Sequence, residues 1–248
     1  MEKEFEGKYA LVTGATSGIG ADIAKLLAKR GLAGIVIVGR NAERGQAVVD
    51  ACKEFGCDAY FSACDIAEVE SVQKTVAYAY EVLPRIDILV NNAGVSPYDD
   101  PWDTESVEHF DFIINTNLRS QFLFCQPIAK AMTKAGYGKI VNFSSCVART
   151  GSGLSLSYGA SKGAILSFTR SLAKAVGPKG VNVNAILPGV IDTPMTAGFD
   201  YTEQAKAWPL QRMGKPEELA EAACFLCSDR SSYMQGVGMD VNGGYVFS

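Results

Sequence analysis

The sequence of 248 residues contains a single histidine and no apolar run long enough to cross a bilayer. One imidazole cannot form a multi-histidine metal site. Its position, His109 within the helix-like run 107–112, argues against a histidine-based catalytic triad and indicates a structural or surface role. The charged N-terminal residues 1–6 lack a secretory signal pattern. We therefore expect neither a signal peptide nor a membrane span.

Basic residues are also sparse and dispersed along the chain. Lys and Arg number 23 against 27 Asp and Glu, which gives a net charge of −4 at pH 7. Nucleic acids and anionic membrane surfaces are bound by dense positive charge, which this chain lacks. The composition therefore predicts no nucleic-acid partner and no membrane partner.

The seven cysteines are an odd number and are scattered through apolar or helix-like segments. This usage favours a reduced, cytoplasmic compartment. Cys224 and Cys227 have C-x-x-C spacing, but no second pair and no nearby histidine completes a zinc site. We expect both thiols to be buried in the core and expect no metal.

The chain alternates short β-rich segments with longer amphipathic ones. The expected strands are 9–13, 34–38, 59–63, 86–90, 139–144, 181–187 and 238–241. The expected helices are 19–29, 42–55, 69–83, 107–134, 158–176 and 216–228. Repeated β-α-β alternation predicts an α/β fold: one domain over 1–248 with a doubly wound, Rossmann-type, parallel seven-stranded sheet and helices on both faces. The long irregular stretch after the sixth strand predicts a substrate lid at about 188–210.

The glycine-rich segment 13–20 directly follows the first expected strand and opens the first expected helix. Glycines let the backbone approach a ligand closely, and the N–H groups at a helix start bind pyrophosphate. The spacing is G-x-x-x-G-x-G rather than G-x-G-x-x-G, and a purely structural turn is the alternative. The strand–turn–helix position favours dinucleotide binding. The residues expected to bind the cofactor here are Gly14, Thr16, Ser17, Gly18, Ile19 and Gly20.

The end of the second expected strand carries Gly39, Arg40 and Asn41. A carboxylate at this place binds the ribose diol of NAD, whereas an arginine accepts the 2′-phosphate of NADP. Arg40 therefore favours NADP(H), with NAD(H) as the alternative cofactor. A solvated arginine is the structural alternative. Arg44, one turn further on, would assist Arg40 or face water.

Two more polar sets stand at strand ends. Segment 91–94, Asn-Asn-Ala-Gly, follows the fourth expected strand, where small residues would let the backbone approach the cofactor; a plain turn is the alternative. Ser144 and Ser145 close the fifth expected strand. Strand ends border the ligand crevice in doubly wound sheets, so a serine hydroxyl there would reach a substrate carbonyl.

Tyr158 and Lys162 stand four residues apart on the next expected helix, so their side chains share one face. An ammonium group nearby stabilises a phenolate and lowers the tyrosine pKa from its usual value of about 10. The phenol then exchanges a proton with a carbonyl or alcohol oxygen near neutral pH. Because such pairs occur by chance in many helices, the prediction depends on the whole set of motifs.

In this order the motifs resemble those of the short-chain dehydrogenase/reductase family, and the resemblance covers essentially the whole chain. It depends on TGATSGIG at 13–20, Asp65, NNAG at 91–94, Asn117, Ser145, YGASK at 158–162 and Pro188-Gly189. It implies an NAD(P)-dependent oxidoreductase that acts on CH–OH groups. No metal is needed for that chemistry.

The resemblance implies four catalytic residues. Tyr158 matches the family's acid/base, and Ser145 matches the serine that polarises the substrate carbonyl. Lys162 matches the lysine that binds the nicotinamide ribose and depresses the tyrosine pKa. Asn117 matches the asparagine that supports a water-linked proton path to that lysine. Ser144 has no such match, and we expect it to pack or to cap.

The resemblance also extends the cofactor site along the chain. The implied residues are Asp65 and Ile66 at the adenine, Asn91, Ala93 and Gly94 beside the adenosine ribose, and Pro188, Gly189, Ile191 and Thr193 in the lid. Tyr158 and Lys162 complete the set. Gly39 stands where NAD-preferring members carry an acid, which supports NADP(H).

The implied reaction moves a hydride between nicotinamide and a ketone or secondary alcohol. Three small-molecule substrate classes are open: a 3-oxoacyl thioester, a hydroxysteroid or bile acid, and a sugar, polyol or diketone. A carrier-protein thioester would favour a basic rim, for which Lys134, Lys139 and Lys179 are candidates. Aromatic and apolar residues in 195–208 suit a bulky apolar substrate or pack on one another. The alternatives are a catalytically silent NADP-binding sensor or scaffold, and an isomerase or dehydratase on the same fold.

The family resemblance further implies a homo-oligomer, either a tetramer or a dimer. The expected contacts are the helices near 107–134 and 158–176 and the C-terminal strand. The apolar C-terminal segment 241–248 suits docking against a partner subunit. For Asp99 and Asp100, a solvated loop is expected, with substrate contact as the alternative.

Overall fold

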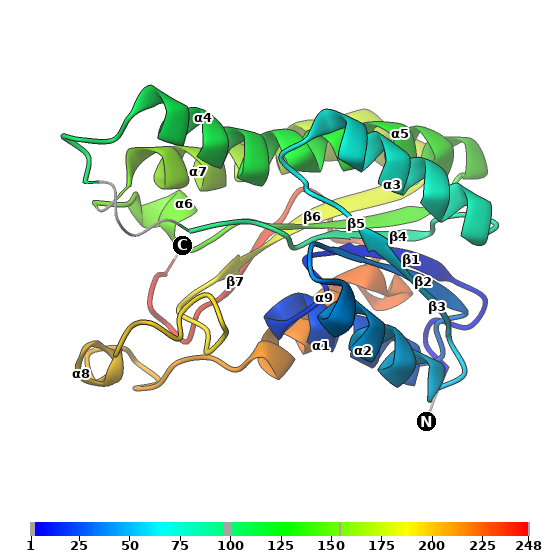
Figure 1. Cartoon of the computed structure of the whole chain (residues 1–248), viewed down its shortest axis with the longest axis horizontal. Helices are drawn as coiled ribbons and strands as arrows, with labels where there is room; N and C mark the ends of the chain where they lie inside the picture. Colours follow the sequence, from blue (N-terminus) through cyan, green and yellow to red (C-terminus); the bar gives the residue numbers. More distant parts are fainter. Residues whose placement is uncertain (1–2, 97–100, 154, 248) are drawn as a thin grey trace.

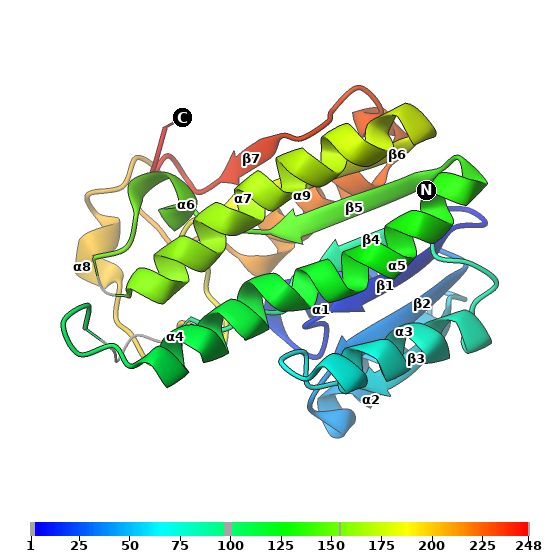
Figure 2. The same cartoon turned by 90° about the horizontal axis from the view of Figure 1, so that it is seen from above.

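The computed structural model describes residues 3–96, 101–153 and 155–247, so Asp99 and Asp100 lie outside the described residues. Strands along the chain form one parallel sheet in the order β3-β2-β1-β4-β5-β6-β7 (Figure 2). They are β1 (Tyr9–Thr13), β2 (Gly34–Gly39), β3 (Asp58–Ala63), β4 (Ile88–Asn91), β5 (Gly138–Phe143), β6 (Val181–Pro188) and β7 (Gly238–Val241). The predicted seven-stranded parallel sheet is therefore confirmed.

Helices cover both faces of the sheet (Figure 1). One face carries α1 (Gly18–Lys29), α2 (Ala42–Lys53) and α9 (Pro216–Cys227), and the other carries α3 (Val69–Val82), α5 (Ser120–Ala135) and α7 (Leu156–Val176). Side chains alternate across a strand, so each face has its own apolar core. In β1, Val12 belongs to the α1/α2/α9 core and Leu11 to the opposite one.

The order of the strands reverses between β1 and β4, because the chain first builds outward to β3 and then restarts on the other side of β1. The register brings Thr13 of β1 opposite Asn91 of β4, and Asn91 opposite Asn142 of β5. Ligands of doubly wound folds bind in the crevice outside the carboxyl ends of the strands at such a reversal. The fold therefore places the binding site at this edge.

The predicted helix over 107–134 is present as one continuous helical run, but it contains a π-helical turn that was not predicted. The segment consists of α4 (Val107–Ile114), a π-helical turn (η1, Asn115–Arg119) and α5. A π turn adds a residue to the helical repeat, which periodicity of apolar residues does not reveal. The wide turn directs Asn117 onto the main chain of Val95, where Nδ2 donates to the carbonyl at 3.0 Å and Oδ1 accepts from the N–H at 2.8 Å.

The catalytic-motif helix also begins earlier than predicted. It starts at Leu156 rather than at Tyr158, because the hydroxyl of Ser155 caps it by accepting a hydrogen bond from the Tyr158 N–H at 3.2 Å. Four further short helices were not predicted: α6 (Val147–Thr150), η2 (Gly177–Lys179), α8 (Thr202–Ala205) and η3 (Asp229–Ser231).

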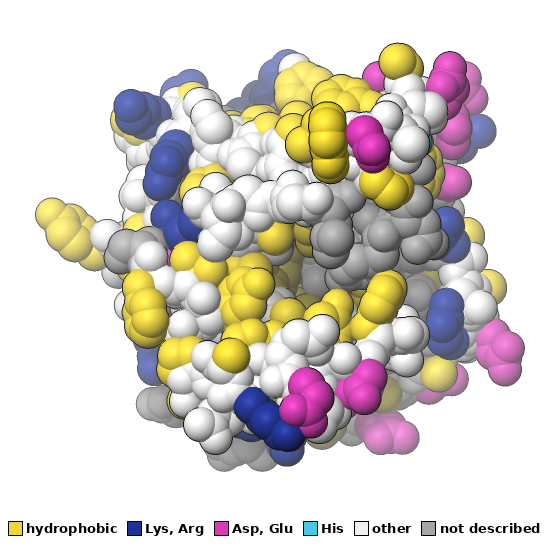
Figure 3. Space-filling model, turned by 90° about the vertical axis from the view of Figure 1, so that its left-hand side faces the viewer, with side chains coloured by type: hydrophobic (Ala, Val, Ile, Leu, Met, Phe, Trp, Pro, Cys, Tyr) yellow, Lys and Arg dark blue, Asp and Glu magenta, His cyan; other side chains and the backbone are white. Residues whose placement is uncertain are grey.

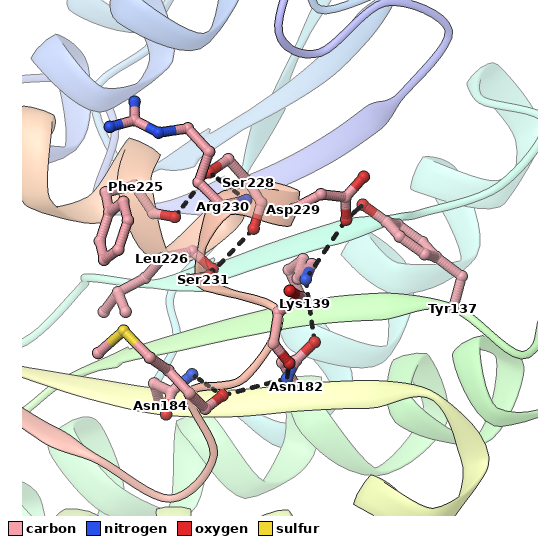
Figure 4. Close-up of polar contacts among 12 residues, drawn as sticks. Tyr137, Lys139, Asn182, Asn184, Phe225, Leu226, Ser228, Asp229, Arg230 and Ser231 are labelled. Atoms are coloured by element: carbon pink, nitrogen blue, oxygen red, sulfur yellow. Dashed lines mark hydrogen bonds and ion pairs between the residues drawn. The ribbon is translucent and has the colours of Figure 1, made fainter.

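At the opposite end of the sheet, where the strands begin, the buried Lys139 is the centre of a set of polar contacts that we call the amino-edge latch (Figure 4). Lys139 donates to Asn182 at 2.9 Å and pairs with Asp229 at 3.4 Å, and the Tyr137 hydroxyl donates to Asp229 at 3.1 Å. Lys134 ends α5 and Lys179 precedes β6, so both stand near the same edge. Within one chain, the three lysines proposed as a basic rim therefore lie away from the ligand crevice.

Candidate active site

A cleft of about 510 Å³ opens at the carboxyl ends of the strands. Figure 3 looks at this side of the molecule and shows a hollow bordered mainly by apolar side chains. The lining comes from the glycine-rich turn, the ends of the central strands, α7 and the segment after β6. All of the predicted site residues line the cleft except Gly20, Asn91 and Asn117.

The glycine-rich turn is tied to the 91–94 segment. Thr13 Oγ1 accepts hydrogen bonds from the N–H groups of Asn92 and Ala93, both at 3.1 Å. Gly14 has φ +64°, and a Cβ there would stand 2.8 Å from the Ala93 Cα, so only glycine fits. A Cβ on Gly20 would collide with the Gly14 carbonyl. Gly20 therefore serves the close packing of the turn rather than the ligand.

The start of α1 is arranged to bind an anion. The Ser17 side chain makes no capping hydrogen bond to the first turn, although Ser17 is the N-cap residue. Ser17, Gly18 and Ile19 all line the cleft. The N–H groups and the positive dipole end of the helix are thus directed at the crevice, as pyrophosphate binding requires.

Two arginines lie at the end of the cleft beside β2. Arg40 and Arg44 both line it, and within the described part of the chain neither makes a salt bridge. Asn41 has another task, because its side chain accepts from the Arg44 N–H at 2.8 Å and so caps α2. An acid in place of Gly39 would require the Thr16 side chain to move, since a Cβ there would lie 2.6 Å from Thr16 Cγ2. This end has the charge to bind a phosphate.

Ser145, Tyr158 and Lys162 meet on one wall of the cleft. Lys162 Nζ lies 5.6 Å from the centre of the Tyr158 ring and donates to the Phe143 carbonyl at 3.2 Å. Burial lowers the pKa of Lys162 to about 8, so the ammonium form still predominates at neutral pH. Ser144 Oγ donates to the Lys162 carbonyl at 2.7 Å, which is the packing role expected for Ser144.

The Ser145 hydroxyl is oriented by its own turn. Its Oγ accepts a hydrogen bond from the Val147 N–H at 3.3 Å and lies 3.9 Å from the Cys146 sulfur, which is a weak acceptor. The serine proton is therefore available to an oxygen of a bound substrate. A hydroxyl donor and a tyrosine with a neighbouring ammonium form an arrangement that can protonate a carbonyl or deprotonate an alcohol.

Asn117 and Asn91 lie behind the lining. Asn117 Nδ2 donates to Ser161 Oγ at 3.2 Å, and a Cβ on Gly94 would stand 3.0 Å from Asn117 Oδ1 and 3.5 Å from Lys162 Nζ. Asn117 thus lies next to the lysine, separated from the cleft by Gly94. Asn91 donates to Asn142 Oδ1 at 2.9 Å between two strands, which is a structural contact.

Sequence reasoning missed part of the cleft wall. Residues that it did not assign to the site include Phe112, Thr116, Ser152, Ser155 and Tyr245. The Thr116 hydroxyl is buried and has no hydrogen-bond partner within the described residues. Thr116 directly precedes Asn117, and this position in the sequence could have indicated that it belongs to the site.

The apolar residues in 195–208 were expected either to line a substrate pocket or to pack on one another, and the structure shows some of each. Met195 and Tyr201 line the cleft, whereas Trp208 packs edge-on against Tyr245 with 5.5 Å between the ring centres. Leu210 N–H donates to the Gly243 carbonyl at 3.2 Å. The C-terminal segment therefore packs partly on residues 208–210 of its own chain, while Phe247 is 83% exposed, so its expected docking against a partner subunit stays a prediction.

The remaining candidates for metal, redox or membrane roles show the following. The seven cysteines are unpaired and buried, and burial raises the pKa of the Cys52 thiol to about 11. Across residues 3–96, 101–153 and 155–247, no group of His, Cys, Asp and Glu residues is placed to hold a metal ion. Nor does that part of the chain contain a helix long and apolar enough to cross a membrane.

Comparisons with known proteins agree with this geometry. A family profile described as enoyl-(acyl carrier protein) reductase matches residues 14–246. A 3-oxoacyl-acyl-carrier-protein reductase of Aquifex aeolicus is 39% identical over 98% of this chain and 99% of its own length. The cis-4-hydroxycyclohexanecarboxylate dehydrogenase of Sinomonas cyclohexanicum is 37% identical, over 99% of each chain.

This chain is also similar to proteins of known structure. A short-chain dehydrogenase/reductase family protein superposes with a TM-score of 0.88 at 39% identity and covers 97% of this chain and 98% of its own. Levodione reductase superposes with a TM-score of 0.92 at 30% identity, with the same coverage of 97% and 98%. These similarities extend over nearly the whole chain.

Proposed function

Since the chain belongs to the short-chain dehydrogenase/reductase family and is an oxidoreductase acting on CH–OH groups with a nicotinamide cofactor, we propose that it transfers a hydride between NADP(H) and a ketone or secondary alcohol. The observation that carries this proposal is the meeting of Ser145, Tyr158 and Lys162 in the same cleft as the glycine-rich turn. The chain is one dinucleotide-binding domain with a substrate lid at about 188–210.

The residues present fit a dinucleotide. The glycine-rich turn and the uncapped start of α1 would hold the pyrophosphate, and Arg40 with Arg44 would hold a 2′-phosphate. Lys162 would hold the nicotinamide ribose, and the backbone at Gly94 would lie beside the adenosine ribose. When bound, the cofactor supplies or accepts the hydride.

The protein residues then handle the proton. Ser145 donates a hydrogen bond to the substrate oxygen and polarises the carbonyl. Tyr158 donates its phenolic proton to that oxygen in reduction and removes it in oxidation, and the Lys162 ammonium stabilises the phenolate. Acid/base help of this kind contributes about 10² to 10⁴ in rate. Asn117 supports the lysine from behind and is a positioning residue.

The preference for NADP(H) is supported by two features of the β2 end. Arg40 and Arg44 are not engaged by carboxylates within the described residues, and Gly39, where a Cβ would meet the Thr16 side chain, supplies no diol-binding acid. A 2′-phosphate would neutralise the two guanidinium groups and accept their hydrogen bonds.

For the substrate we propose a 3-oxoacyl thioester. The relatives named above as 3-oxoacyl reductases support it, and so does the apolar wall formed by Phe112, Met195 and Tyr245, which fits an acyl chain. The same wall would accept a cyclic ketone, which makes that class the second candidate.

We also propose a homo-oligomer in the cytoplasm. A shallow apolar groove on the outer face is lined by Ile114, Leu118 and Phe122 from one helical segment and by Ala164 and Phe168 from α7. A second copy of the chain would bury this groove. Unpaired, buried thiols favour a reducing compartment.

The test is NADPH and NADH consumption by purified protein with acetoacetyl thioesters, cyclic ketones, oxo-steroids, diketones and keto-sugars. Tyr158→Phe is assayed beside Tyr80→Phe, a control on the exposed side of α3. NADPH-dependent turnover that is lost only in Tyr158→Phe supports the proposal. Unchanged turnover in Tyr158→Phe contradicts it. Tight NADPH binding without turnover would indicate a sensor, and turnover without net cofactor oxidation an isomerase or dehydratase.

A further inference from the structure

Glu105 is a nearly buried carboxylate outside every motif used above. It precedes α4 in the segment that leads from the cleft wall at Ser96 to the helix carrying Phe112. Its side chain is only 5% exposed. A carboxylate is seldom buried to this degree unless hydrogen bonds and charges compensate it, so its contacts indicate what it does.

Those contacts are with residues at the start of α7, the helix that carries Tyr158 and Lys162. Glu105 Oε2 accepts a hydrogen bond from the Ser157 N–H at 3.2 Å. Glu105 Oε1 accepts one hydrogen bond from the Ser157 hydroxyl and another from Ser155 Oγ at 3.5 Å. Ser155 is the N-cap and accepts from the Tyr158 N–H. The first N–H groups of a helix have no partner within it. Here Ser155 and Glu105 satisfy them together, in the turn that carries Tyr158.

Charge supports the same arrangement. His109 Nδ1 of α4 lies 3.5 Å from Glu105 Oε1 and is the titratable group that faces the carboxylate from that helix. Burial alone would raise the pKa of Glu105, but the hydrogen bonds from Ser157 and the charge of His109 outweigh it and hold the pKa below its usual range. The carboxylate is therefore ionised at the working pH, and it stabilises the positive end of the helix dipole.

We propose that Glu105 is a positioning residue for the reaction, which fixes the first turn of α7, and with it Tyr158, against the segment of α4 and the π turn packed beside it. The inference rests on the proposed function. Phe112 and Thr116 of the α4 and π-turn segment and Ser155 and Tyr158 at the start of α7 all line the cleft. Glu105 bonds the approach to α4 to the start of α7, and Asn117 joins the π turn to Ser161 one turn further along α7. The Tyr158 phenol is thereby held at a fixed place in the cleft lining, where a bound substrate would meet it.

The charge of Glu105 has a second, measurable consequence. A negative charge beside the first turn of α7 disfavours the Tyr158 phenolate, whereas Lys162 favours it. Neutralising Glu105 should therefore lower the tyrosine pKa. In the oxidation direction, the acid limb of the pH–rate profile should move to lower pH.

Glu105→Gln and Ser157→Ala test the inference, with Glu108→Gln, exposed on the first turn of α4, as the matched control. For Glu105→Gln we expect kcat to fall about tenfold, the NADPH Kd to stay within about twofold, and the acid limb to shift by about half a pH unit. Ser157→Ala keeps the charge, so kcat should fall without that shift. Glu108→Gln should match the wild type.

Two results would overturn the inference. One is an unchanged kcat and pH profile in Glu105→Gln. The other is a loss of thermal stability and NADPH affinity together with no shift of the pH profile, which a purely structural role would give. Wild-type turnover is measured first: its absence contradicts the proposed function and this inference together, whereas failure of the inference alone leaves wild-type turnover intact.

Discussion

Lys162 Nζ donates a 3.2 Å hydrogen bond to the main-chain carbonyl of Phe143, in a junction between α7 and the end of β5 that buries the lysine to 6% exposure. Desolvation lowers the pKa of Lys162 from 10.5 to about 8. The unfolded chain therefore binds this proton more tightly than the folded chain. Below pH 8 the folded apoprotein is destabilised by the full free energy of burying the protonated lysine. This destabilisation disappears as the pH rises from about 8 to about 10.5.

We predict that Lys162→Met abolishes turnover but makes the apoprotein more stable at pH 7. A shift of this size corresponds to about 3 kcal/mol at most, and the lost hydrogen bond to Phe143 reduces the gain to about 1–2 kcal/mol. The gain should shrink between pH 8 and pH 10. Urea unfolding of the apoprotein across this range measures it, with Lys174→Met at the exposed end of the same helix as the control. A stability difference that is constant with pH would contradict the argument.

Gly39 and Thr16 lead to a prediction about cofactor choice. Gly39→Asp alone should weaken NADPH use at least tenfold and bring little NADH use, because its Cβ would meet Thr16 Cγ2 at 2.6 Å. The pair Gly39→Asp with Thr16→Ser removes that methyl group and should raise NADH use. The ratio of kcat/KM for the two cofactors is the readout, and Thr16→Ser alone is the control. Efficient NADH use by the single Gly39→Asp variant would show that the contact is unimportant.

Phe122 tests the proposed contact between copies of the chain. It is 44% exposed and lines the outer apolar groove. Phe122→Asp should shift the protein toward a smaller species, because a charge buried in an apolar contact costs several kcal/mol. Light scattering after size exclusion measures the mass, with Phe55→Asp on the exposed end of the α2 region as the control. An unchanged mass for Phe122→Asp would place the subunit contact elsewhere.

The amino-edge latch should matter for stability and not for the reaction. Lys139→Met removes the hydrogen bond to Asn182 and the ion pair with Asp229 and leaves Asn182 without its donor. We expect a loss of about 1–3 kcal/mol in the free energy of unfolding, with kcat and KM unchanged. Chemical unfolding compared with Lys134→Met, an exposed lysine near the same edge, gives the measurement. A changed KM would connect this edge to the cleft.

The fold could be predicted from the sequence because the strands, the β-α-β alternation and the order of the motifs all indicate the same doubly wound sheet. Each β-rich run became a strand within about two residues of its predicted bounds, since parallel strands buried on both faces leave a strong apolar signal. The order of the motifs also placed Ser145, Tyr158 and Lys162 in one cleft. Only three predicted site residues, Gly20, Asn91 and Asn117, lie behind its lining.

What the sequence did not show depends on contacts between distant segments. Nothing local distinguishes Lys139, which is buried beside Asp229, from Lys134, which is exposed. Glu105 reaches Ser157, fifty-two positions further along the chain. The π turn widens a single turn of the helix, and the spacing of apolar residues over 107–134 does not reveal a change of that size.

The contact between Trp208 and Tyr245 joins the proposed lid to the C-terminal segment, of which Tyr245 also borders the cleft. Opening of the lid would therefore displace the C-terminal segment with it. A fluorophore attached near Phe247, whose side chain is 83% exposed, would report the closing of the lid over a bound substrate in real time. An affinity tag fused at this end would interfere with the same movement, whereas the N-terminal end of the chain lies on the far side of the molecule (Figure 1).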